Sequence, residues 1–193
     1  MRRLIYTVLI LFIAAQTGMT SDETSPEALL KKKLDAAIAV LQKKDLDQQK
    51  KNEQLVDIVK PMFDFDLMAK LSLGRKYWPG LSEQKREEFT NVFIKRLQAS
   101  YLEKLSLYTD EKIFLKAAVQ DGRKVRIPTE ILSNNNKISM VYKFYRTKQD
   151  WKIYDLEIEG VSIISTYRSQ FDQVLSKGTI DELLQRLEKP EKK

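Results

Sequence analysis

Residues 151–187 read WKIYDLEIEGVSIISTYRSQFDQVLSKGTIDELLQRL, and this block decides the fold. It begins with the alternating apolar pattern of a strand and turns at Gly160. A helix with one apolar face follows, and Gly178 ends it. Thr179 then begins a capping box with Glu182, which starts a last helix. The block therefore predicts a strand, a turn and two helices in that order.

The apolar phase of this strand slips along its length. In a regular strand Trp151 and Ile153 lie on one face, whereas Leu156 and Ile158 lie on the other. A β-bulge near Tyr154 explains the slip and bends the strand. Because bent sheets make concave surfaces, the block predicts a curved sheet.

Three further strands are predicted upstream, where the apolar period is again two residues. They lie within 113–119, 125–131 and 138–144, and they are separated by polar turns. Together with the strand at 151–158 they predict a four-stranded antiparallel meander.

Helices are predicted before the meander as well as after it. One apolar stripe follows Pro26, which suits the first turn of a helix, and a shorter stripe ends before Pro61. Asp64 and Gly74 suit the start and the end of a short helix. Four-residue steps of apolar side chains across 82–108 predict the longest helix. The expected class is α+β, with helices covering one face of a curved four-stranded antiparallel sheet.

The first twenty residues predict a signal peptide. Arg2 and Arg3 precede an uncharged apolar run at 4–15, and the small and polar residues after it suit cleavage by a signal peptidase. This run is shorter than the ~20 residues that a membrane-spanning helix needs. A short membrane anchor is the alternative. The rest divides into one domain, 26–188, and a charged tail, 189–193.

Charge and composition narrow the classes of function. The 193 residues include 34 basic and 27 acidic ones, and the net charge of +7 falls to about +5 without the leader. A basic surface suits an anionic membrane or an acidic partner, and export argues against nucleic acid. A solvated basic surface with no specific partner is the alternative.

The chemistry of a catalytic site is largely missing from the chain. With no His and no Cys, imidazole and thiolate machinery is absent, and the scattered glycines form no phosphate loop. Asp155, Glu157 and Glu159 form the one carboxylate cluster near the predicted concavity, and charges on a sheet face explain them more simply than an acid/base pair. We therefore expect no enzyme, no metal and no cofactor. An interior that holds an apolar ligand is one possibility, and a filled core is the other.

Motifs spread over residues 27–188 carry a resemblance to one known family. They are FDFDLMA at 63–69, Leu73-Gly74 with Trp78, Gln84 with Phe89 and Phe93, Tyr101, Tyr108, VRIPT at 125–129, WKIYD at 151–155, EGVS at 159–162, and YR with QF within 167–171. These motifs resemble the MlaC / toluene-tolerance family, the periplasmic lipid carriers of Gram-negative bacteria. Asp150 and Thr166 depart from the glycine and asparagine that are common there.

The resemblance implies a cone-like fold related to nuclear transport factor two, with extra helices and an apolar cavity. Members of the family hold phospholipid acyl chains in this cavity with the headgroup outward, and lipid is their cargo rather than a cofactor. They exchange lipid with an inner-membrane ABC transporter complex that has a periplasmic lipid-binding subunit, and with an outer-membrane lipoprotein–porin complex. The implied location is the periplasm.

The cavity walls are expected to come from the longest helix, the sheet and the last two helices. The expected lipid-binding residues are Trp78, Phe93, Leu97, Tyr101, Tyr108, Tyr142, Phe144, Tyr154, Ile158, Val161, Ile164, Tyr167 and Phe171. Arg168 has two interpretations, an ion pair with Asp155 or Glu159, or a contact with a headgroup or a partner. An enzyme of the same fold with a carboxylate base and a ligand-free adaptor are the alternative functions.

Overall fold

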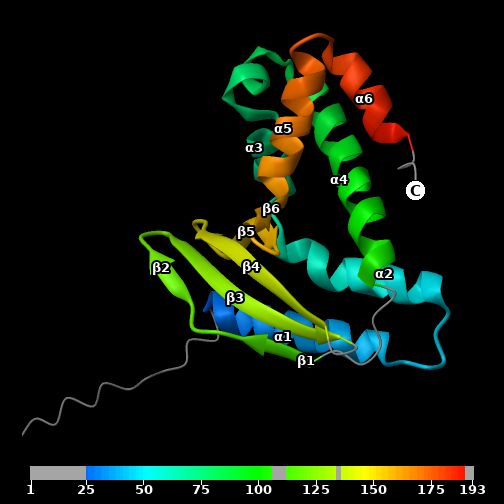
Figure 1. Cartoon of the computed structure of the whole chain (residues 1–193), viewed down its shortest axis with the longest axis vertical. Helices are drawn as coiled ribbons and strands as arrows, with labels where there is room; N and C mark the ends of the chain where they lie inside the picture. The colour runs from blue at the N-terminus through cyan, green and yellow to red at the C-terminus, as the bar shows by residue number, and fades with distance from the viewer. Residues whose placement is uncertain (1–24, 106–111, 134–135, 190–193) are drawn as a thin grey trace, which may run out of the picture.

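The computed structural model describes residues 25–105, 112–133 and 136–189 (Figure 1). The elements before the sheet are α1 Pro26–Leu41, α2 Gln48–Val59, the 3₁₀ helix η1 Lys60–Met62, α3 Phe65–Tyr77, the 3₁₀ helix η2 Trp78–Gly80 and α4 Glu83–Leu105. The strands are β1 Lys112–Leu115, β2 Val119–Asp121, β3 Lys124–Ser133, β4 Asn136–Arg146, β5 Trp151–Ile158 and β6 Val161–Ser162. The last helices are α5 Ile163–Leu175 and α6 Ile180–Glu188. The α+β class is confirmed.

The sheet is antiparallel and open, with the order β1-β3-β4-β5-β6, and β2 pairs with the same edge of β3 as β1. In the described part of the chain the sheet contains six strands instead of the four expected. The first expected strand is split into β1 and β2 beside Pro128, which has no N–H to donate to the ladder. The sixth strand, β6, is folded back onto β5 by a tight turn in which Glu159 and Gly160 both have positive φ, 49° and 77°.

The predicted β-bulge is confirmed. Lys143 pairs with Asp155 and the next residue, Phe144, pairs with Ile153, so Tyr154 is the inserted residue. Since the insertion shifts the alternation by one, Ile153 and Leu156 have buried neighbours on the same face of β4.

The helix ends follow the predicted caps, with one difference. The carboxylate of Asp64 accepts a hydrogen bond from the N–H of Leu67 at 2.9 Å, and Thr179 and Glu182 form the capping box. Gly74, expected to end α3, has φ +78° and kinks the helix, which continues to Tyr77. Glycine reaches this left-handed conformation without the strain that a Cβ would add.

Two apolar clusters divide the helices between them, and we name them by their position. In the sheet cluster, α1 packs along one face of the sheet (Figure 1), and its buried members are Leu30, Leu34, Met62, Val125, Ile127, Tyr142, Phe144 and Ile153. In the helical cluster, α3, α4, α5 and α6 pack on one another beyond β5, and its buried members are Met68, Ala69, Leu73, Phe89, Val92, Phe93, Leu97, Ile163, Ile164, Tyr167, Phe171, Leu183, Leu184 and Leu187.

Candidate functional site

Most of the expected lipid-binding residues belong to the helical cluster. Those buried in it are Phe93, Leu97, Ile164, Tyr167 and Phe171, and those partly buried against it are Trp78, Tyr101 and Ile158. Their rings pack edge to face: the centroid of Phe93 lies 5.2 Å from that of Tyr167 and 6.1 Å from that of Phe171. These side chains fill the space between α4 and α5 as close-packed core.

Tyr142 and Phe144 belong instead to the sheet cluster. Both side chains lie on the face of β4 that α1 covers, together with Ile127 of β3. Burial raises the pKa of the Tyr142 hydroxyl to about 12, because the phenolate is poorly solvated there. The structure therefore places the sheet residues and the helix residues, which were expected to form different walls of one cavity, in two separate clusters.

The last three expected residues lie outside both clusters or outside the described residues. Tyr154, the bulge residue, packs its ring against that of Tyr145, with 6.1 Å between the ring centroids. The ammonium of Lys124 lies over the same Tyr154 ring. Val161 of β6 is 59% exposed. Tyr108 lies outside the described residues. The assignment of all thirteen residues to lipid stays a prediction.

The two clusters meet at Phe63 and Leu156, which pack against both. We call this junction the seam. Next to the seam, Met140 of β4 and Ile158 of β5 are cross-strand neighbours. Met140 packs on the sheet cluster, whereas Ile158 packs on the helical cluster. Sequence reasoning had quoted Phe63 in a motif and Leu156 in the phase slip, but it assigned neither to the site.

A buried carboxylate fastens α5 to the sheet. Asp155 is 5% exposed, and one of its oxygens accepts hydrogen bonds from the hydroxyl of Ser162 at 2.8 Å and the ammonium of Lys143 at 3.0 Å. Its other oxygen accepts from the N–H groups of Leu156 at 2.9 Å and Ile164 at 3.2 Å. All its contacts hold the first turn of α5 and the bulge, so its role is structural. Serine at the helix N-cap was the sequence signal that could have pointed to it.

Arg168 pairs with neither Asp155 nor Glu159, so the expected ion pair is wrong. Its Nε and Nη2 donate to the carbonyl oxygen of Leu71 at 2.8 and 2.6 Å. That carbonyl lies just before the kink of α3, where the turn of the helix is interrupted. The guanidinium therefore completes the hydrogen bonding of a helix that is distant in sequence.

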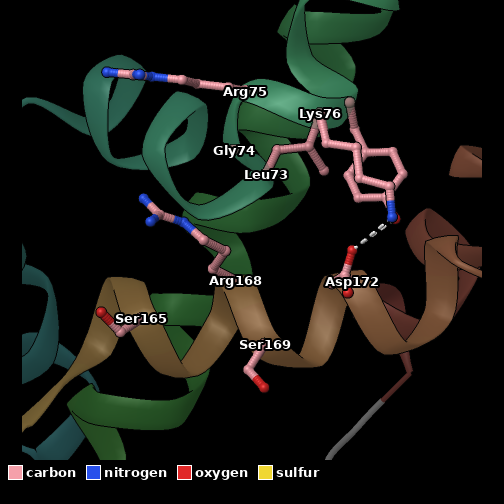
Figure 2. Close-up of a pocket in the computed structure, with 9 residues that line it drawn as sticks. Leu73, Gly74, Arg75, Lys76, Ser165, Arg168, Ser169 and Asp172 are labelled. Atoms are coloured by element: carbon pink, nitrogen blue, oxygen red, sulfur yellow. Dashed lines mark hydrogen bonds and ion pairs between the residues drawn. The ribbon is translucent and has the colours of Figure 1, made fainter.

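Arg168 also borders a pocket of about 400 Å³ between α3 and α5, which we call the α3–α5 pocket (Figure 2). Its lining residues are Leu73, Gly74, Arg75, Lys76, Tyr77, Ser165, Arg168, Ser169 and Asp172. A second concavity of about 500 Å³ lies where η1, the start of α3, α4 and β5 meet, and Phe63 and Phe65 stack in it with 5.5 Å between ring centroids. Among the described residues, no expected lipid-binding residue lines either one.

Comparison with known proteins identifies the family. The family model described as MlaC protein matches residues 31–189, which is most of the chain. The chain belongs to the MlaC family. Among MlaC relatives, the intermembrane phospholipid transport system binding protein MlaC of Haemophilus influenzae is 24% identical over 191 residues, covering 94% of this chain and 88% of that protein. The toluene tolerance protein ttg2D of Pseudomonas putida is 23% identical over 126 residues, covering 64% of this chain and 59% of that protein.

A solved structure extends the MlaC comparison to three dimensions. The phospholipid-binding protein of Ralstonia solanacearum, determined in complex with a phospholipid, superposes with a TM-score of 0.75 at 26% identity. The match covers 83% of this chain and 93% of that one. The resemblance seen in the sequence motifs is thereby confirmed.

Proposed function

We propose that the protein is a periplasmic lipid carrier, which holds the acyl chains of a phospholipid inside the domain and shuttles the lipid between the inner and outer membranes. The observation that carries this proposal is the match to a phospholipid-binding protein solved with its lipid. The name of the Haemophilus relative, a phospholipid transport binding protein, supports it.

The seam is where we expect the acyl chains to enter. The two clusters are each packed internally, with Phe93 and Phe144 fully buried, but among the described residues only Phe63 and Leu156 pack on both. Separating two clusters along such a junction breaks fewer contacts than hollowing either one. The expected wall residues of both clusters would then face the lipid from opposite sides.

The energy of apolar burial supports a protein container for this cargo. Each buried CH₂ contributes ~0.8 kcal/mol, so two chains of about sixteen carbons contribute on the order of 20 kcal/mol before ordering costs. A free lipid would lose this free energy of burial on leaving a membrane. A carrier offsets the loss by surrounding the acyl chains with apolar side chains. The separation of the clusters must cost less than this gain.

The remaining parts of the proposal concern location and partners. Residues 1–20 would direct export and be removed, leaving the lipid-binding domain at 26–188 and the charged tail at 189–193 in the periplasm. The partners would be an inner-membrane ABC transporter complex with its periplasmic lipid-binding subunit and an outer-membrane lipoprotein–porin complex. No role with nucleic acid is proposed.

The alternative of a cone-fold enzyme gains no support from the carboxylates. Such an enzyme needs a buried Asp or Glu free to accept a proton inside a cavity. Asp155 is the buried acidic side chain among the described residues, and each of its oxygens already accepts two hydrogen bonds. We therefore propose a carrier and not a catalyst.

Extraction with organic solvent followed by mass spectrometry tests the carrier proposal. Purified protein, incubated with phospholipid vesicles and separated from them, should release phospholipid. The variant Ile158→Glu places a charge next to the seam and should release at least about tenfold less, because an acyl chain cannot solvate a carboxylate. Val119→Glu, at a 58% exposed position of β2, is the matched control and should behave as the parent.

Lipid-free parent protein with an intact circular-dichroism spectrum would contradict the carrier proposal and favour a ligand-free adaptor. Equal loading of the Ile158→Glu and Val119→Glu variants would leave a carrier but remove the seam as the entry for acyl chains.

A further inference from the structure

The α3–α5 pocket carries more positive charge than its own acidic residue can neutralise. Lys76 donates to Asp172 at 3.1 Å, and the hydroxyl of Tyr77 donates to the same carboxylate at 2.7 Å. These hydrogen bonds, first that of Tyr77 and then that of Lys76, hold the pKa of Asp172 below its usual value, so the Lys76–Asp172 pair is neutral as a unit at pH 7. Arg75 and Arg168 are left as two positive charges.

Neither guanidinium is paired with an acidic side chain in the described part of the chain. Arg75 is exposed, and no described residue forms a hydrogen bond or ion pair with it. Within the described ranges Arg168 donates only to the neutral carbonyl of Leu71, which leaves its charge and its other N–H groups available to a ligand. Figure 2 shows both guanidinium groups on the left of the view, away from the Lys76–Asp172 pair and separated from each other by a turn of ribbon.

The helical cluster closes the inner side of the α3–α5 pocket. Leu73, 2% exposed, belongs both to its lining and to the helical cluster, whose packed rings lie behind it. A headgroup attached to acyl chains at the seam therefore has no path to this pocket through the core. An occupant of this pocket therefore enters from the outer surface of the domain.

The surroundings favour a protein segment over a membrane surface. Peripheral membrane sites combine basic residues with exposed apolar anchors. The exposed large apolar side chains of the described residues are Phe114, Val119, Leu132 and Val161, and all of them lie on strands rather than on α3 or α5. A concavity of about 400 Å³ admits side chains of an extended segment, but not the plane of a bilayer.

We propose that the α3–α5 pocket is a docking site for an acidic segment of a protein partner, with carboxylates of that segment bound by Arg75 and by Arg168. The planar guanidinium presents paired N–H donors that match a carboxylate, and two guanidinium groups at one pocket suit a segment with more than one carboxylate. The hydroxyls of Ser165 and Ser169 on α5 are further donors at the pocket wall. Docking here leaves the seam free for lipid exchange.

Nuclear magnetic resonance with a hexaglutamate peptide tests this proposal. The peptide is titrated into isotope-labelled protein at about 150 mM salt, where contacts beyond ~8 Å are screened. The side-chain Nε–H signals of Arg75 and Arg168 should shift together in a saturable way. The variant Arg75→Glu should weaken binding at least about tenfold, since it removes a charged hydrogen-bond donor. Lys32→Glu on α1 makes the same change of charge at an exposed position outside the pocket and should stay within about twofold of the parent.

Three results would overturn the docking proposal. Equal weakening by Arg75→Glu and Lys32→Glu would mean general electrostatic attraction. Inorganic phosphate producing the same shifts and affinity at equal ionic strength would mean a small-anion site. Binding to phosphatidylglycerol vesicles that depends on Arg75, without hexaglutamate binding, would mean a membrane contact. Lipid content, measured by mass spectrometry in the same samples, separates failure of the carrier proposal from failure of this one.

Discussion

Replacing Asp155 by asparagine tests whether this buried carboxylate is what fastens α5 to the curved sheet. Asparagine keeps the shape and one acceptor oxygen, which can still receive the N–H groups of Leu156 and Ile164. The amide nitrogen takes the place of the oxygen that accepts from Ser162 and Lys143. The variant therefore loses the charged contact and brings an N–H₂ group against an ammonium.

The magnitude follows from the lost contacts. A hydrogen bond to a charged group contributes about 1.5–3 kcal/mol, and the side chain of Lys143 is only 17% exposed. Lys143 keeps its ion pair with Glu157 at 2.5 Å, so its ammonium still has an acidic partner in the variant. We expect Asp155→Asn to lower the free energy of unfolding by about 2–3 kcal/mol. Asp155→Ala, which removes all four contacts, should cost about 4 kcal/mol.

Urea unfolding at pH 7, followed by circular dichroism, measures the effect. With a slope near 2 kcal/mol per molar urea, the midpoint of Asp155→Asn should fall by about 1–1.5 M. Asp150→Asn, an exposed aspartate in the β4–β5 turn, is the control and should change the free energy by less than about 0.5 kcal/mol. If Asp155→Asn matched this control, the argument that Asp155 anchors α5 would be refuted.

Three further predictions concern single side chains of the sheet and its junctions. Hydrogen bonds from Lys116 and Lys137 lower the pKa of Glu130. The stabilisation from these bonds is present above the unfolded pKa near 4.3 and is lost as the pH falls further. The melting temperatures of Glu130→Gln and of the parent protein should therefore differ at pH 7 and converge toward pH 3. Desolvation and the hydrogen bond to Asp64 raise the pKa of Tyr145 to about 12, so this stabilisation is complete below pH ~10 and is lost at higher pH. Tyr145→Phe should lose one late-titrating phenol in an absorbance titration and about 1 kcal/mol at pH 7, and an unchanged titration would contradict this assignment. Gly160→Ala should cost about 1 kcal/mol in urea unfolding, because φ of +77° strains a Cβ, and a neutral result would argue against the tight turn.

Local features of the fold could be predicted because they depend on residues close in sequence. The cap at Asp64, the box at Thr179 and the bulge at Tyr154 all follow from patterns within a few residues, and the structure has each of them. The strand count was wrong because Pro128 interrupts a ladder on one edge of β3 and because the chain folds back after β5 to form β6. The first effect depends on which edge of the strand faces which neighbour.

The candidate site was harder to predict, because apolar character shows that a residue is buried but not against what. Phe93 and Phe144 were expected to line one cavity from different walls, and the structure buries them in different clusters. The seam at Phe63 and Leu156 appears only when the two clusters are placed side by side. No single segment contains that information.

The sequence by itself determined the α+β class, the β-bulge of β5, the helix caps and the absence of His and Cys chemistry. It also carried the motifs of the MlaC family. Only the tertiary structure decided that Arg168 donates to the carbonyl of Leu71, 97 residues away. It also decided that Asp155 accepts hydrogen bonds from Lys143 and from the first turn of α5. The physical reason is that a cap or a turn is satisfied by its neighbours in sequence, whereas a guanidinium or a buried carboxylate takes whichever partner the packing of distant elements brings within hydrogen-bonding distance.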